Sequence, residues 1–214
     1  MTVYIQDIHL IKPLPDRQNS RDLFVWLKEI IPASIKEEID SDLCGLYIAT
    51  KDFGAASSVQ FWRDALTTGF AFANPREFPV TLSSYLASMI AMHLSIKGIN
   101  QTFVGECTVY NDAFIQAILD LQSKKIKECL IFKIPALQTN VDKSGQNIII
   151  THLIMDENNS HNPLPAIQLC SKSNQTDRFK TVDDALYALK EGGIKGSEYY
   201  IQTDLSKDMC IQLF

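Results

Sequence analysis

Residues Phe103–Phe114 read FVGECTVYNDAF, and this stretch decides how the chain is interpreted. A short apolar run reaches Gly105, one acid and then Cys107 follow, and the next residues have the pattern of a helix. A cysteine at the start of a helix can act as a nucleophile, because the helix dipole and the free N–H groups of the first turn lower the pKa of a thiol. It can also be an ordinary buried thiol. The other residues have to distinguish these two roles.

Composition indicates one globular domain. The chain has 214 residues, of which 46% are hydrophobic, enough for one sizeable core, so we expect a single domain over residues 1–214. The net charge of -5 and the lack of a basic stripe argue against nucleic-acid binding. The sequence has no signal peptide, membrane span, phosphate-binding loop or zinc-type cluster. We therefore expect a cytoplasmic protein with free thiols, no cofactor and no metal.

Strand and helix patterns alternate along the chain. This order predicts an α/β fold, with a mixed sheet and helices on both faces. The helix from about Thr108 to Gln122 should be buried between the sheet and other helices, because its apolar residues occupy more than one narrow stripe. We expect Ser57 or Ser58 to cap an earlier helix, and Gly98 to end a helix over Val80–Ser95. The strands near Ile148 and Ile167 should form an antiparallel element late in the sheet.

Residues 74–132 resemble the core of a β-ketoacyl synthase of the thiolase superfamily. The shared features are Asn-Pro and Phe-Pro at the entry, a helix of small residues, the turn Ile96-Lys97-Gly98, and Cys107 nine residues after Gly98. The resemblance covers about residues 3–155 and looks closest to stand-alone β-ketoacyl synthase N-terminal-like proteins of aryl polyene gene sets. It implies a three-layer, thiolase-like half-fold followed by a tail of strands and a helix over residues 156–214.

The same resemblance assigns candidate site residues. It makes Cys107 the candidate acyl-accepting nucleophile, and Phe103 and Tyr110 the candidate substrate-binding residues. Two departures count against activity. Glu106 would raise the pKa of the neighbouring thiol by like-charge repulsion, and Tyr110, three residues after Cys107, would fill space that an acyl chain needs.

A condensing enzyme also needs an enolate-stabilising donor and an oxyanion hole. A complete ketosynthase is about twice as long as this chain, and its two segments with active-site histidines have no counterpart here. The chain offers His9, His93, His152 and His161. A lone histidine on an apolar face is more often a hydrogen-bonded core residue than a catalyst.

Two functions remain open. The first is an accessory protein in fatty-acid or polyketide synthesis of the aryl polyene type, which binds an acyl chain, an acyl carrier protein or a full-length ketosynthase. The alternative is a cysteine-dependent acyltransferase or thioesterase that works through Cys107. By the family's geometry we expect a homodimer or hetero-oligomer in which the strand Gln101–Glu106 lies at the interface. A partner, or the tail from about Gln168, would cover the face that the missing half leaves open.

Overall fold

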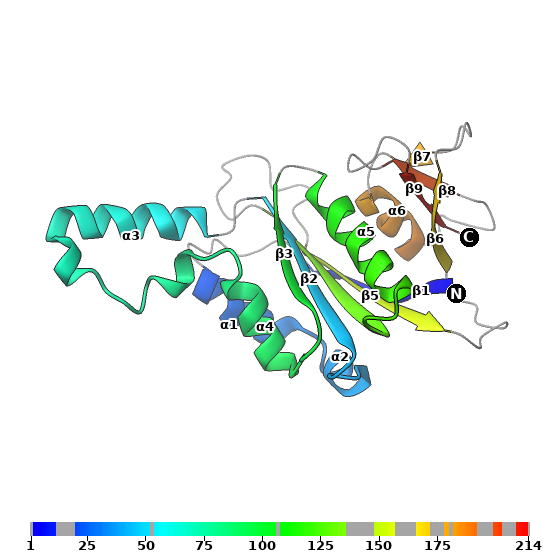
Figure 1. Cartoon of the computed structure of the whole chain (residues 1–214), viewed down its shortest axis with the longest axis horizontal. Helices are drawn as coiled ribbons and strands as arrows, with labels where there is room; N and C mark the ends of the chain where they lie inside the picture. The colour runs from blue at the N-terminus through cyan, green and yellow to red at the C-terminus, as the bar shows by residue number, and fades with distance from the viewer. Residues whose placement is uncertain are drawn as a thin grey trace.

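The computed structural model describes most of the chain (Figure 1). The described residues are 2–11, 20–51, 54–105, 108–135, 148–156, 166–171, 178–179, 182–191, 199–202 and 209–213. No helix within these ranges is long and apolar enough to cross a membrane.

The described strands form one mixed sheet. β2 is parallel to β3 and β4, whereas β5 runs antiparallel to both β4 and β1. The sheet order is β3 (Asn100–Val104), β2 (Cys44–Thr50), β4 (Glu128–Ile134), β5 (Ile148–Asp156), β1 (Thr2–Ile11), β6 (Ala166–Ser171), β9 (Met209–Leu213), β8 (Tyr199–Gln202) and β7 (Arg178–Phe179).

Helices cover both faces of this sheet. Side chains alternate between the faces along a strand, so Leu46 and Ile48 of β2 pack on one core, and Tyr47 and Ala49 on the other. The first core is completed by α1 (Ser20–Ile30), α2 (Ala33–Glu38) and α4 (Tyr85–Leu94), and the second by α5 (Val109–Gln122) and α6 (Val182–Lys190). The prediction of a three-layer α/β fold with a mixed sheet is confirmed.

α5 is the most deeply buried helix of the second core. Nine of its fourteen residues are buried, so the predicted burial of this helix is confirmed. Phe114, Ile118 and Leu121 are nearly inaccessible to solvent, and burying each such side chain stabilises the fold by about 2 kcal/mol. The helix is therefore a fixed part of the core.

The helix predicted over Val80–Ser95 is shorter than expected. Pro79–Thr81 forms a separate 3-10 turn, η2, and α4 ends at Ser95, which adopts a left-handed conformation with φ of 60°. The prediction that Gly98 ends this helix is therefore wrong, and Gly98 has another role. A Cβ atom there would lie 2.2 Å from the carbonyl oxygen of Cys44, so glycine is needed for the close approach of the backbone to β2.

The predicted serine cap of the preceding helix is also wrong. α3 (Ala55–Thr68) begins directly after Gly54, whose φ of 89° is left-handed, and Ser58 lies inside the helix, donating its N–H to the Gly54 carbonyl at 2.8 Å. Glycine tolerates this conformation at no steric cost, so the helix starts earlier than the serines suggest.

The C-terminal part of the chain extends the sheet beyond β1 and adds α6 to the α5 face. Val182, Ala185 and Leu186 of α6 are buried in the second core. The described part of the tail thus covers part of the α5 face, which the sequence analysis expected a partner or the tail to cover. The strands near Ile148 and Ile167 are not neighbours: β1 lies between β5 and β6 and pairs antiparallel with each of them.

Candidate functional site

The segment around the predicted nucleophile lies at one end of the sheet. β2 and β3 are parallel, so their carboxyl ends meet at the same edge, where Gly105 donates its N–H to the Thr50 carbonyl at 3.1 Å. Thr108 then stands at the start of α5. Glu106 and Cys107 lie outside the described residues, so the nucleophile remains a prediction.

Tyr110 fills the core beneath the first turn of α5. Its side chain is buried, its ring packs edge-on against Phe114, and its hydroxyl lies 2.9 Å from Oγ1 of Thr151 on β5. Burial raises the pKa of Tyr110, and the hydrogen bond with Thr151 offsets only part of this rise. The residue is a neutral, hydrogen-bonded phenol that occupies space. Its role in substrate binding stays a prediction.

Phe103, the second candidate substrate residue, lies half-buried on β3. Its ring centroid is 6.5 Å from that of Tyr47, and both rings belong to the core on the α5 face. Phe103 and Tyr110 therefore pack on the same core, and their role in substrate binding stays a prediction.

The three described histidines all lie away from the face that α5 covers. His152 pairs in register with Leu130, which belongs to the α1/α4 core, and its Nε2 lies 2.8 Å from the carboxylate of Glu128. Glu128 also accepts a hydrogen bond from the backbone N–H of Asp40. This buried cluster is at the amino end of β4, opposite the edge near Gly105.

His93 and His9 have local partners as well. His93 packs edge-on against Phe24 of α1, with ring centroids 6.4 Å apart, and its pKa is lowered by burial and by nearby lysines. His9 lies 3.1 Å from a carboxylate oxygen of Asp7 and pairs in register with Ile150 of the α1/α4 core. Neither histidine faces α5. His161 lies outside the described residues.

A half-buried lysine, missed by sequence analysis, lies on the α5 side. Lys133 of β4 pairs in register with Ala49 and forms an ion pair with Asp183 in the first turn of α6. Burial lowers the pKa of Lys133 to about 8, and Asp184 opposes this shift. A charged residue inside the apolar run ECLIFKI was the signal that could have found it.

Asn111 links α6 to the start of α5 through a hydrogen bond. This residue is buried in the first turn of α5, and its Oδ1 accepts the backbone N–H of Val182 at 3.2 Å. Together with the Lys133–Asp183 ion pair, it fixes the amino end of α6 beside the amino end of α5. The tail is thereby attached to the first turn of α5.

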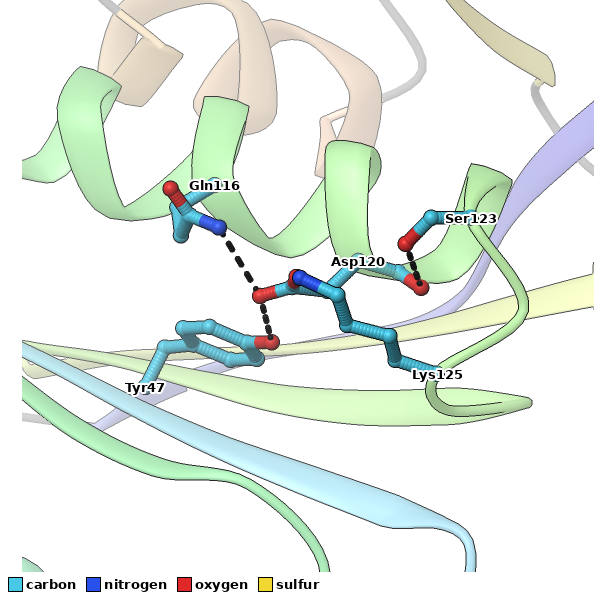
Figure 2. A network of polar contacts seen from close by, with 5 residues as sticks. All are labelled: Tyr47, Gln116, Asp120, Ser123 and Lys125. Atoms are coloured by element: carbon cyan, nitrogen blue, oxygen red, sulfur yellow. Dashed lines mark hydrogen bonds and ion pairs between the residues drawn. The ribbon is translucent and has the colours of Figure 1, made fainter.

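The opposite end of α5 is held by a second polar cluster (Figure 2). The buried carboxylate of Asp120 accepts hydrogen bonds from the Tyr47 hydroxyl at 2.9 Å, the Gln116 amide at 2.9 Å and the Lys125 ammonium at 2.8 Å. Burial raises the pKa of Asp120, but the hydrogen bonds from Lys125, Gln116 and Tyr47 outweigh burial and lower it overall. The cluster joins β2, α5 and the turn after α5, so α5 is fixed at both ends.

Two of the thiols, those of Cys44 and Cys129, lie in the core. Cys44 and Cys129 are buried and free, and burial is the main cause that raises the pKa of each. Their free state confirms the prediction for these two residues. In the backbone register of β6 and β9, position 170 lies opposite position 210, and each of these positions holds a cysteine.

No protein-family model matches the chain, and no curated protein sequence matches it. Solved structures do match its fold. One chain of the complex of the ketosynthase ApeO with its chain length factor ApeC, from Xenorhabdus doucetiae, aligns with 100% of this chain and 99% of its own length, at 8% identity and a TM-score of 0.56. This chain has a thiolase-like fold of the ketosynthase type.

Two further ketosynthase structures share this fold. A type II polyketide ketosynthase, solved with its acyl carrier protein, aligns with 91% of this chain and 70% of its own length, at 11% identity and a TM-score of 0.57. The ishigamide ketosynthase/chain length factor aligns with 74% of this chain at 16% identity and a TM-score of 0.51, and this chain spans 49% of that protein's length. At these identities the likeness establishes the ketosynthase-type fold alone.

Proposed function

We propose that this chain is an accessory subunit of a ketosynthase, of the chain-length-factor kind, in polyketide or fatty-acid-like synthesis of the aryl polyene type. In this role it pairs with a full-length ketosynthase in the cytoplasm and contributes to the space that holds the growing acyl chain or to the docking of its carrier protein. It is not a complete condensing enzyme.

One observation carries the proposal. A chain of the same length and fold, aligned from end to end, is part of an assembly of a ketosynthase with its chain length factor. Ketosynthases of the usual length are only partly covered by this chain. A half-length ketosynthase-type fold is thus compatible with work inside such an assembly.

The arrangement of polar residues supports an accessory role. Condensation requires donors that stabilise the enolate, and histidines most often fill this role. The described His9, His93 and His152 lie on the face opposite α5, and each has a partner within its own layer. On the α5 face Lys133 is paired with Asp183, so it is not free to act on a substrate.

The partner surface includes β3. In the described sheet β3 is an edge strand that pairs only with β2, and its terminal residues Asn100 and Val104 are exposed. A free edge offers unpaired backbone groups to a second strand. We therefore keep the prediction that this strand lies at or close to the subunit interface.

The test compares the purified chain with its assembly. Alone, the chain should not condense acyl and malonyl carrier-protein thioesters. Mixed with a full-length ketosynthase of the same genome, it should change the rate or the product length, and Cys107→Ala should leave that effect unchanged. Carbon–carbon bond formation by the isolated chain, abolished by Cys107→Ala, would refute the accessory role.

The alternative, acyl transfer through Cys107, has its own readout. Iodoacetamide at neutral pH should label an activated Cys107 fast and selectively, with the buried Cys44 and Cys129 as internal controls. Labelling at the rate of a free model thiol supports the accessory role. Much faster labelling, together with a trapped acyl thioester on Cys107, favours the enzyme.

A further inference from the structure

The segment Gly54–Leu82, named the arm here, extends away from the rest of the fold (Figure 1). It contains α3, the 3-10 turn η1 (Phe70–Phe72) and η2. None of its residues belongs to either core, and α3 packs mainly on η1 and η2. At the base of the arm, the Ser58 hydroxyl donates a hydrogen bond to the Thr81 carbonyl at 3.3 Å. The arm is therefore a separate projection with few contacts to the layers.

The arm carries apolar side chains that its own chain leaves exposed. Phe72 is 80% exposed, and the rings of Trp62 and Phe70 lie 5.9 Å apart in an edge-on contact. Phe61 contacts both Trp62 and Phe78 in the same way. The exposed apolar residues of the arm are Val59, Trp62, Leu66, Phe70, Phe72, Phe78 and Leu82.

The exposed area is large enough for a stable interface. The four exposed aromatic side chains alone present roughly 500 Å² of apolar surface, since a whole aromatic side chain buries about 200 Å². With Val59, Leu66 and Leu82, the arm approaches the roughly 800 Å² that one partner buries in a standard protein interface.

The arm carries no net charge, so electrostatic attraction does not select its binding partner. The charged residues of the arm are Arg63, Asp64, Arg76 and Glu77, which cancel. Glu77 is already paired with Arg21 of α1 at 3.3 Å. An aromatic surface without net charge suits burial against another protein, whereas binding to nucleic acid requires a basic surface.

We infer that the arm docks on the ketosynthase subunit with which this chain assembles. The inference rests on the proposed function and names the surface that makes the assembly. The arm leaves the sheet at the carboxyl end of β2, where β3 also ends, and Figure 1 shows it on the β3 side. A partner that adds to the free edge of β3 therefore meets the arm.

The experiment co-expresses the full chain with each ketosynthase encoded in its genome and measures the dissociation constant of the complex that forms. Trp62→Asp and Phe72→Asp should each weaken binding about 30-fold or more, as expected for aromatic residues at the centre of an interface. Gln60→Ala is the matched control on α3. Its side-chain amide donates to Asp64 one turn along the same helix, so binding should stay within about twofold.

Folding is controlled separately. Both aromatic positions lie outside the two cores, so the variants should keep the thermal midpoint and the circular dichroism of the parent. A variant that unfolds is replaced by Leu66→Ser, which alters a residue 71% exposed.

The outcomes separate the two proposals. Failure of the parent chain to bind any ketosynthase refutes the proposed function. Binding by the parent that the arm variants leave unchanged refutes the arm inference alone. Arm variants that dissolve a dimer of this chain in light scattering, with ketosynthase binding unaltered, identify a second copy as the occupant and also overturn the inference.

Discussion

Replacement of Asp120 by asparagine tests how α5 is held against the sheet. Asparagine has nearly the same shape, but it removes the charge and turns one acceptor oxygen into an NH₂ donor. This group would face the Tyr47 hydroxyl, the Gln116 amide or the Lys125 ammonium, all of which donate to the carboxylate (Figure 2). At least one hydrogen bond is therefore lost and one donor is left opposite another donor.

The expected loss is about 2–4 kcal/mol in the free energy of unfolding. A hydrogen bond to a charged group contributes about 1.5–3 kcal/mol when buried. Tyr47 is buried and Gln116 is half-buried, so both count near this value, whereas the mostly exposed Lys125 adds less than about 1 kcal/mol. Tyr47→Phe alone should cost about 1–2 kcal/mol, and its loss should overlap with that of Asp120→Asn because the two share one bond.

Urea unfolding at pH 7 measures both variants and their combination. The net pKa of Asp120 is lowered from its ordinary 3.8, so its stabilisation is fully present above that value and is lost as pH falls through the lower folded pKa. Asp120→Asn should therefore weaken the acid dependence of stability. The exposed Asp64→Asn is the matched control and should change stability by less than about 0.5 kcal/mol. An equally small effect of Asp120→Asn would refute this account of the cluster.

Three further variants test other contacts. Burial places the pKa of Lys133 near 8, below its ordinary 10.5, so between these pH values the unfolded state binds more protons than the folded state. In urea unfolding, the stability of the parent relative to Lys133→Met should therefore rise by about 2–3 kcal/mol from pH 8 to 10.5. A fall in this difference would contradict the assignment. Tyr110→Phe should lower the free energy of unfolding by about 1–2 kcal/mol, because the buried Thr151 hydroxyl loses its hydrogen-bond partner. The near-ultraviolet circular dichroism should keep its sign. An unaltered melting curve would contradict the hydrogen bond. Gly98→Ala should cost about 3 kcal/mol or more, since its Cβ would meet the Cys44 backbone; a thermal midpoint equal to that of the parent would show that the backbone moves apart freely.

The sequence predicted the layers well because the signals for them are local. The mostly apolar runs at β2 and β4, and the broad apolar face of α5, indicate burial without any knowledge of the neighbours. Polar contacts were missed because their partners are far apart in sequence. Tyr47 and Asp120 are 73 residues apart, and nothing around either residue points to the other.

The arm shows a different limit of sequence patterns. Val59, Trp62 and Leu66 lie at helical spacing, as in any helix that packs on a core, and their exposure depends on where the fold directs α3. Apolar periodicity shows which face seeks burial, not whether the same chain provides it. The candidate site has the same limit. The sequence offered His152 as one of four histidines, but only the strand register places it on the face opposite α5.

The position of β1 between β5 and β6 has a consequence for synthesis. The strand Thr2–Ile11 pairs with Ile148–Asp156 and with Ala166–Ser171, so its two partners leave the ribosome about 140 and about 155 residues after it does. At about 5–20 residues per second, this apolar strand waits roughly 10–30 seconds with both edges unpaired. The wait exposes it to chaperones and to wrong strand partners, and pairings so distant in sequence form slowly in refolding as well. We therefore expect the yield of folded protein to depend on temperature and on the rate of translation more strongly than the stability of the finished sheet would suggest.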